Sequence, residues 1–379
     1  MSLALSEEQE LLKSTAREFV SENSPVKELR RLRDAQDPVG FSRSLWKRMG
    51  ELGWAGIVLP EELGGAGLGY AELGIVLEEC GRTLAATPLV STTLLAGNAL
   101  LLGGNETQRK EILPAVAKAE RILALALQEA AHHAPYAIAT QGLAISSGYR
   151  LRGKKTFVLD GHVADQLVVV ARSAGSSGDR DGLSLFLVPK SARGLTVQRT
   201  IMVDGRNAAN VRLDGVEVER SALVGFAGRG ADVLDAVLDR ATIGLSAEML
   251  GTLTEAFERT IKYLKERKQF GVPIGSFQAL KHRAANMFVE VELARSIVLD
   301  ALRAIDENRP DLSQLASIAK ARASDAVHLI GNEAVQMFGG IGVTDEEEIG
   351  LFLKRARVGE LTLGDAAYHR ARFARLNAF

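Results

Sequence analysis

The stretch Tyr263–Met287 reads YLKERKQFGVPIGSFQALKHRAANM. Apolar residues recur at helical intervals on both flanks, but the segment from Gly271 to Gly275 holds Pro273, which lacks a backbone N–H, and glycines that favour turns. The stretch therefore predicts the end of one helix, a tight connector and the start of another. Side chains and free backbone groups can both meet a ligand at such a corner, although a solvated helix hairpin is the plainer interpretation of so basic a stretch. The charged, amide and aromatic residues around the connector are Arg267, Lys268, Gln269, Phe270, Phe277 and Gln278.

The composition is typical of a soluble globular protein. Of the 379 residues, 46% are hydrophobic and 25% are charged, which suits two or three packed units. The formal net charge of -1 removes the electrostatic argument for nucleic acid or an anionic membrane as a partner. Cys80 is the only cysteine, so no internal disulfide can form and a reducing compartment is expected. No apolar segment approaches the ~18 residues of a membrane span, and the adjacent histidines at 132 and 133 lack metal-site spacing, so we expect a cytoplasmic protein without a metal.

Helical patterns fill the first third of the chain. Ser6 and Gln9 have the spacing of a capping box, which predicts a helix start near residue 6. Glycine, proline and asparagine separate the later helical patterns, which cover residues 44–52, 71–82, 89–102 and 108–119. A glycine-rich run at 64–69 lacks the spacing of a nucleotide-binding loop and predicts a structural turn.

The period changes after Arg121. Short β-type runs, separated by turn residues and with no helical pattern between them, predict an antiparallel unit. These runs cover residues 122–127, 142–146, 156–159, 166–171, 183–188, 195–197 and 210–218. After Gly230 the helical period returns in long stretches that predict a bundle. We therefore predict an α+β multidomain fold with an N-terminal helical domain (1–120), a middle antiparallel β barrel or sandwich (121–230) and a C-terminal four-helix bundle (231–379).

Four local matches make the chain resemble the acyl-CoA dehydrogenase family over nearly its full length. They are LPEELGGAGLGYAELGIVLEECGR (59–82), GYRLRGKKTFVLDGHVAD (148–165), the stretch Tyr263–Met287, and QMFGGIGVTDE (336–346). The last two together are highly specific. The resemblance implies a flavoprotein that holds FAD between the β unit and the C-terminal bundle. It also implies removal of the α-proton and β-hydride of an acyl-CoA thioester.

The resemblance places the adenosine and pyrophosphate end of FAD at the opening corner. Arg267 and Phe270 match family positions that hold this end, and the chemistry agrees, because a guanidinium fork suits pyrophosphate and an aromatic face suits adenine. In the family these residues usually reach the flavin of a neighbouring subunit, which implies a homotetramer, or a heterotetramer with a related chain. The other positions that the resemblance assigns to FAD here are Gln269, Phe277, Gln278, Gln336, Gly339 and Gly340.

The flavin-facing phrases of the β unit depart from the family. Most relatives read Thr-Glu-Pro-Gly-Ala-Gly-Ser-Asp where this chain has residues 128–135, so Gln128 and Ala134 replace the threonine and the serine, while Glu129 is kept. The family's Trp-Ile-Thr becomes Phe157-Val158-Leu159, which keeps an aromatic residue and loses the hydroxyl. The resemblance implies that Gln128, Phe157 and Leu159 contact FAD, in part through backbone N–H groups, and that Ala134 lies at the substrate.

The resemblance implies that the usual base of the family is missing. Most relatives carry Glu-Gly-Thr near the C-terminus, and the alignment puts Leu363-Gly364-Asp365 there. Leucine cannot accept a proton, although its N–H can bond the thioester oxygen; by resemblance Gly364 lines the substrate and Asp365 the FAD. Some relatives place their glutamate on the long helix directly before an arginine, and here that pair is Asp239-Arg240, with Arg240 at the substrate. A helical wheel turns Asp239 away from the apolar stripe, so it is either the base on a second buried surface or a solvated aspartate.

Three interpretations stay open. The first is FAD-dependent α,β-dehydrogenation of an acyl-CoA thioester with Asp239 as the base. The second is a FAD-binding, base-less subunit of a heteromeric acyl-CoA dehydrogenase, of the kind that some bacteria use for steroid side-chain CoA esters. The third is a non-catalytic homologue that keeps the fold for structure or partner binding. By resemblance, an electron-transferring flavoprotein is the expected acceptor and fatty acid β-oxidation the expected context.

Overall fold

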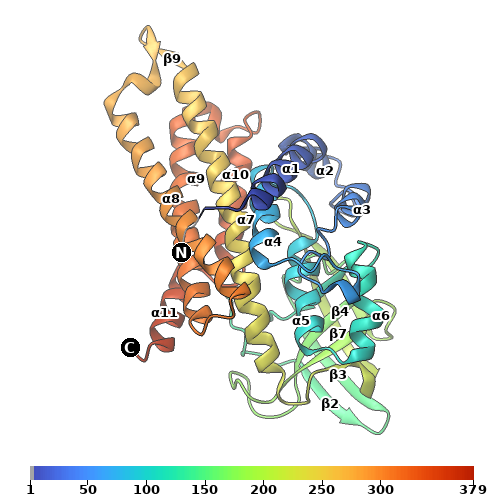
Figure 1. Ribbon diagram of the computed structural model, residues 1–379. Helices are drawn as coiled ribbons and strands as arrows, with labels where there is room; N and C mark the ends of the chain where they lie inside the picture. Colours follow the sequence, from blue (N-terminus) through green and yellow to red (C-terminus); the bar gives the residue numbers. More distant parts are fainter. Residues whose placement is uncertain (1–3) are drawn as a thin grey trace. The chain divides into compact units, whose positions relative to one another are not determined.

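The computed structural model describes residues 4–379, which form two compact units (Figure 1). The first, here called the helical unit, takes in the described residues up to Ala35, Tyr70–Ala85 and Thr242–Phe379. The second, here called the sheet unit, takes in Gln36–Gly69 and Ala86–Ala241. Helix α7 (Gly230–Glu266) is continuous and supplies residues to both units. Within residues 4–379, no helix is long and apolar enough to cross a membrane.

The helical unit is built around α9. This helix packs against α8, α10 and α11, while α1 packs against α4. Ser6 caps α1 as predicted: its hydroxyl accepts from the Gln9 N–H at 3.2 Å, and the Gln9 side chain accepts from the Ser6 N–H at 3.1 Å. The helices are α1 (Glu7–Asn23), α2 (Val26–Asp34), α4 (Tyr70–Arg82), α8 (Gln278–Asp306), α9 (Leu312–Phe338), α10 (Ile349–Leu361) and α11 (Ala366–Leu376), with short 3-10 turns η4 (Ile274–Ser276) and η5 (Gly339–Val343).

Helices α4 and α7 cross at two glycines. A Cβ atom on Gly81 would lie 2.0 Å from the carbonyl oxygen of Glu248, and one on Gly251 would lie 1.8 Å from that of Glu78. The Thr252 hydroxyl also donates to the Gly81 carbonyl at 3.2 Å. Backbones approach this closely only where a side chain is absent, so the crossing depends on both glycines.

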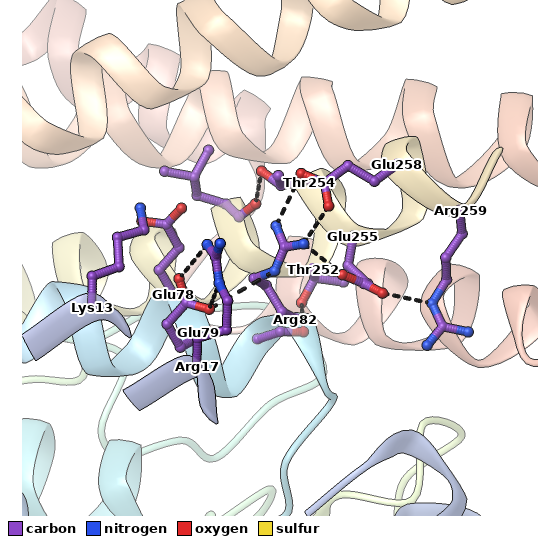
Figure 2. Close-up of polar contacts among 12 residues, drawn as sticks. Lys13, Arg17, Glu78, Glu79, Arg82, Thr252, Thr254, Glu255, Glu258 and Arg259 are labelled. Atoms are coloured by element: carbon purple, nitrogen blue, oxygen red, sulfur yellow. Dashed lines mark hydrogen bonds and ion pairs between the residues drawn. The ribbon is translucent and has the colours of Figure 1, made fainter. Parts of the chain in front are cut away.

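Buried carboxylates beside this crossing are paired with cations from several helices (Figure 2). Glu79 is fully buried and accepts two hydrogen bonds from the guanidinium of Arg17, at 2.9 and 3.0 Å. A buried charge without a partner is costly, so these pairs stabilise the packing of α1, α4, α7 and α8 within the helical unit. Further pairs beside the crossing include Lys13–Glu78 at 3.1 Å, Arg295–Glu78 at 2.9 Å, Arg355–Glu248 at 3.3 Å and, at a partly exposed carboxylate, Arg82–Glu255 at 2.8 Å.

An eight-stranded sheet forms the centre of the sheet unit. The strand order is β6-β7-β3-β2-β4-β5-β8, and β1 pairs with β4. Strands β4 and β5 are almost entirely buried and form the middle of the core. The strands are β1 (Leu123–Ala126), β2 (Gln141–Ile145), β3 (Gly148–Lys155), β4 (Gln166–Arg172), β5 (Leu183–Pro189), β6 (Leu195–Ile201), β7 (Asn207–Glu219) and β8 (Leu223–Val224). The helical pieces are α3 (Arg43–Glu51), η1 (Glu61–Leu63), η2 (Leu89–Gly97), α5 (Asn98–Gly103), α6 (Glu106–Ala117) and η3 (Arg220–Ala222).

The structure confirms the predicted fold class and corrects several local predictions. The predicted strand at 156–159 is wrong, because Phe157 and Asp160 adopt left-handed backbone angles (φ 51° and 53°) that end the extended chain. Strand β3, just before it, was not predicted. The sheet is mixed rather than wholly antiparallel, since β1 and one residue pair of β2 run parallel to β4. The helix predicted at 89–102 begins as a π-helix, and α2 was not predicted.

Candidate functional site

The corner predicted within Tyr263–Met287 forms in the structure. Helix α7 ends at Glu266 and α8 begins at Gln278. Between them the N–H of Ile274 donates to the carbonyl of Arg267 at 2.8 Å, closing a small hairpin of β9 (Lys268–Gln269) and β10 (Val272–Pro273). Figure 1 shows this hairpin projecting beyond the ends of α7 and α8. Phe270 (φ 55°) and Gly271 (φ 81°) make its turn.

Polar and aromatic groups are exposed together on this corner. Phe270 is 91% exposed and its ring lies edge-on to that of Phe277, with 6.2 Å between the ring centroids. Arg267, Gln269 and Gln278 are also exposed. Aromatic faces left in water carry a hydration cost that a bound ligand or partner would remove. A guanidinium, two amides and two aromatic rings are a donor set that fits the adenosine and pyrophosphate end of a dinucleotide.

The glycine loop after α9 lies against this corner. The Tyr263 ring stacks on that of Phe338, with centroids 4.2 Å apart, and the Tyr263 hydroxyl donates to the Phe338 carbonyl at 3.3 Å. Gly339 follows with φ 69°, a conformation that favours glycine. A Cβ on Gly339 or Gly340 would meet no atom within 4 Å, so the loop faces open space. The contact of Tyr263 with Phe338 therefore joins the two predicted FAD segments, and Gln336 of the second segment is exposed.

The turn at Leu363-Gly364-Asp365 joins α10 to α11. Leu363 is buried and adopts φ 59°, and Gly364 adopts φ 100°. The Asp365 carboxylate accepts from the Tyr368 N–H at 2.8 Å and caps α11. Among the described backbone hydrogen bonds outside helices and strands, none has the Leu363 N–H as donor. The turn therefore leaves this N–H available while the neighbouring carboxylate is engaged.

Two buried side chains hold the carbonyls of this turn. The Nζ of Lys320 donates to the carbonyl of Gly364 at 2.7 Å and to that of Glu360 at 3.0 Å. His369 Nε2 lies 3.0 Å from the Leu363 carbonyl oxygen, which can only accept, so Nε2 carries the proton. Burial lowers the pKa of Lys320 to about 7, against the charges of Glu360 and Asp365, which raise it. Sequence reasoning missed both residues; a lysine on the apolar face of α9 was the available signal.

In the sheet unit, an ion pair fixes the phrase that begins at Gln128. Lys155 is almost fully buried, and its Nζ donates to the Glu129 carboxylate at 2.6 Å and to the Leu127 carbonyl at 3.1 Å. Glu129 also accepts from the N–H groups of Ala139 and Thr140. Burial lowers the pKa of Lys155 to about 8, although Glu129 opposes this shift.

A backbone hydrogen bond beside this pair joins the segment of Phe157 to the phrase that begins at Gln128. The N–H of Thr156 donates to the Gln128 carbonyl at 2.7 Å, so the two flavin-facing phrases predicted from sequence are adjacent. Phe157 itself is half-exposed, whereas Leu159 is buried. Ala134 lies exposed in the loop that Glu129 ties down. The Thr156–Gln128 hydrogen bond therefore brings together the segments that carry Gln128, Phe157 and Leu159, and of these three Leu159 is buried.

Asp239 and Arg240 lie in the part of α7 that belongs to the sheet unit. Asp239 is only 5% exposed, so the alternative of a solvated helix aspartate is wrong. Asp239 therefore lies on a buried surface of α7, away from the apolar stripe that the helical wheel identified. Arg240 donates to the Ala236 carbonyl at 3.0 Å.

Comparison with known proteins assigns the chain by sequence. The N-terminal, middle and C-terminal domains of acyl-CoA dehydrogenase match residues 6–120, 126–216 and 228–376. A probable acyl-CoA dehydrogenase of Bacillus subtilis, YngJ, is 31% identical over 383 residues, covering 99% of this chain and 99% of the relative.

Solved structures agree with this assignment. A chain from the study of the electron transferring flavoprotein of Acidaminococcus fermentans superimposes with a TM-score of 0.92 at 30% identity, covering 100% of this chain and 99% of the other. A chain of the ChsE4-ChsE5 complex from Mycobacterium tuberculosis gives a TM-score of 0.89 at 27% identity, covering 100% and 99%. The sequence matches, together with the exposed arginine and aromatic corner beside the glycine loop, show that the chain belongs to the acyl-CoA dehydrogenase family.

Proposed function

We propose that this chain is the catalytic subunit of a FAD-dependent dehydrogenase that introduces an α,β double bond into an acyl-CoA thioester. The observation that carries this is the contact of Tyr263 with Phe338, which joins the end of α7 to the glycine loop, while Arg267, Phe270 and Gln336 on these two segments are all exposed. FAD is the cofactor and, when bound, accepts the hydride that leaves the β-carbon. Arg267 would hold the pyrophosphate and Phe270 the adenine. The remaining FAD contacts we propose are Gln269, Phe277, Gln278, Gly339 and Gly340, with Gln128, Phe157, Leu159 and Asp365 towards the flavin.

The reaction also requires that a proton be removed from the α-carbon of the substrate. We assign Asp239 as the base that takes it from the α-carbon, because a carboxylate with 5% exposure is shielded from water, as a base in a dry pocket must be. Arg240, Ala134 and Gly364 would line the substrate. The Leu363 N–H, which no described backbone acceptor uses, would bond the thioester oxygen and stabilise the negative charge that develops there.

A second candidate function is that of a FAD-binding subunit whose partner chain supplies the base. It is favoured by the departures from the family that we infer from the resemblance. The corner residues match the family pattern, whereas Leu363, Ala134 and Leu159 stand where that pattern has a glutamate, a serine and a threonine. The similarity to one chain of the ChsE4-ChsE5 complex also supports it. Such a heterotetramer would act on steroid side-chain CoA esters. In either case an electron-transferring flavoprotein is the acceptor that we propose, in a cytoplasmic β-oxidation pathway.

Anaerobic titration of the chain, expressed alone, tests these functions. Loss of the 450 nm flavin absorbance on adding butyryl-CoA, octanoyl-CoA, palmitoyl-CoA or a steroid side-chain CoA ester is expected for the catalytic subunit. A yellow protein that all four esters leave oxidised would favour the second function, and bleaching should then require a co-expressed, glutamate-bearing homologue. A protein that binds no FAD even after reconstitution would contradict both.

A further inference from the structure

Lys320 is a fully buried lysine that the carboxylates of Glu360 and Asp365 reach through their charge, without a direct ion pair among the described residues. It lies on α9 at 0% exposure and forms no ion pair within the described residues. Its three donors instead go to the carbonyls of Gly364 and Glu360, at 2.7 and 3.0 Å, and to the hydroxyl of Ser324, at 3.2 Å. Burying an ammonium group is costly, and a methionine of similar length would fill the space without that cost. The hydrogen bonds from Lys320 to the carbonyls of Gly364 and Glu360 therefore indicate a role for this residue beyond packing.

Two of those bonds fix the turn that carries Leu363. Glu360 lies in the last turn of α10, and Gly364 directly precedes the cap of α11, so Lys320 ties both ends of the segment to α9. His369, from α11, donates to the carbonyl between them, that of Leu363. Consecutive carbonyls at 363 and 364 are thus both held by buried donors.

The conformation that these bonds hold is unfavourable on its own. Leucine rarely adopts a left-handed backbone, yet Leu363 has φ 59°. Such a residue persists only where its surroundings fix it, and such residues cluster at functional sites. With the carbonyls of 363 and 364 held inside, the Leu363 N–H is the polar backbone group of this turn that has no described backbone acceptor.

We propose that Lys320 is a positioning residue for substrate: it holds the 360–364 turn so that the Leu363 N–H is presented to the thioester carbonyl oxygen. This inference rests on the proposed function, in which that N–H binds the substrate. Lys320 touches neither substrate nor cofactor in this account, and acts through the turn. Its removal should therefore affect recognition of the thioester carbonyl more than recognition of the CoA moiety.

The test compares Lys320→Met, Lys320→Gln and a control, Lys27→Met, whose lysine is exposed on α2 of the same unit. Hydrogen exchange of the FAD-loaded proteins is measured by mass spectrometry on peptides covering 360–369. We expect exchange there to be at least tenfold faster in Lys320→Met, intermediate in Lys320→Gln and unchanged in Lys27→Met, with α8 unaffected. This arm needs no substrate, and exchange at the wild-type rate in both Lys320 variants would overturn the proposal.

The second arm measures binding by perturbation of the flavin spectrum, using butyryl-CoA, octanoyl-CoA and palmitoyl-CoA together with free CoA, which lacks the thioester carbonyl. We expect Lys320→Met to weaken the best ester by about tenfold, the effect of one lost hydrogen bond, and free CoA by less than twofold. If Lys320→Met weakens the binding of the ester and of free CoA equally, or weakens neither, the positioning role is overturned. If the wild type binds no ester, the proposed function fails, while the exchange arm still decides whether Lys320 holds the turn. Should Lys320→Met fail to fold, Lys320→Gln carries both arms.

Discussion

Replacing Gly81 by alanine should destabilise the helical unit by opening the α4–α7 crossing. The new Cβ would lie 2.0 Å from the Glu248 carbonyl oxygen, 2.9 Å from its carbonyl carbon and 3.1 Å from the Thr252 nitrogen. These are backbone atoms of α7, which cannot rotate aside as a side chain can. Ordinary contact would require the two helices to separate by about 1.4 Å, a large displacement in a close-packed core.

The magnitude follows from three contributions. Overpacking a core costs about 1–3 kcal/mol. Separating the helices also lengthens the hydrogen bond from the Thr252 hydroxyl to the Gly81 carbonyl, which is 3.2 Å in the unaltered protein, at a cost of about 1 kcal/mol. Alanine returns about 1 kcal/mol through its higher helix propensity. We expect a net loss of about 2 kcal/mol, and more if the ion pairs of Arg17 and Lys13 with the carboxylates next to Gly81 are pulled apart (Figure 2).

Thermal unfolding of the FAD-loaded protein, at one fixed protein concentration, is the assay. A loss of this size should lower the melting temperature by about 4–8 °C in a unit of this size. Gly350→Ala, in α10, is the matched control, because its Cβ would lie 3.6 Å from the nearest atom, the Gly342 carbonyl oxygen. It should leave the melting temperature unchanged or slightly raised. Gly81→Ala melting at or above the wild-type temperature would refute the reasoning.

Three further predictions concern charged groups. Arg267→Ala should weaken FAD binding by roughly 10- to 100-fold, the effect of losing charge-assisted hydrogen bonds, measured by flavin fluorescence, with Lys27→Met unaffected. Glu129→Gln leaves the buried Lys155 without its counter-charge and should lower stability by about 3 kcal/mol in urea titrations, whereas Glu217→Gln, at the exposed pair with Arg150, should change it by less than about 1 kcal/mol. Burial lowers the pKa of Lys320 to about 7, so between pH 7 and 10.5 the unfolded chain binds more protons at this residue, and its contribution to stability rises with pH. The free energy of unfolding of the wild type minus that of Lys320→Met should rise by up to about 1.4 kcal/mol per pH unit from pH 7 to 9. A difference that does not change with pH would contradict the lowered pKa of Lys320.

The sequence could predict features whose causes are local. Pro273 and the glycines around it dictate a break, and the break lies between Glu266 and Gln278 as expected. Ser6 and Gln9 carry their capping box within four residues, so the start of α1 was also predictable. The periodicity of apolar residues also predicted the fold class, and the family resemblance then supplied FAD and the candidate site residues that the corner alone could not identify.

Features with distant causes were not predictable in the same way. Strand β3 buries Lys155 as well as Leu151, so its buried face is not uniformly apolar, and the strand is fixed by pairing with β7 about sixty residues later in the chain. The burial of Asp239 comes from tertiary packing, which a helical wheel does not contain. Lys320 gives no sign of its role in sequence, because its partners are carbonyl groups forty and forty-four residues further along.

The central claim is that the buried carboxylate of Asp239 removes the α-proton, and the rate of anaerobic flavin reduction by a bound acyl-CoA tests it most directly. Asp239→Asn keeps the size of the side chain and removes its ability to accept the proton. We predict that it binds FAD as the wild type does and is reduced about 100- to 10,000-fold more slowly. The control Asp232→Asn, at an exposed aspartate near the start of the same helix, should be reduced at the wild-type rate. Asp239→Asn reduced as fast as the wild type would contradict the claim.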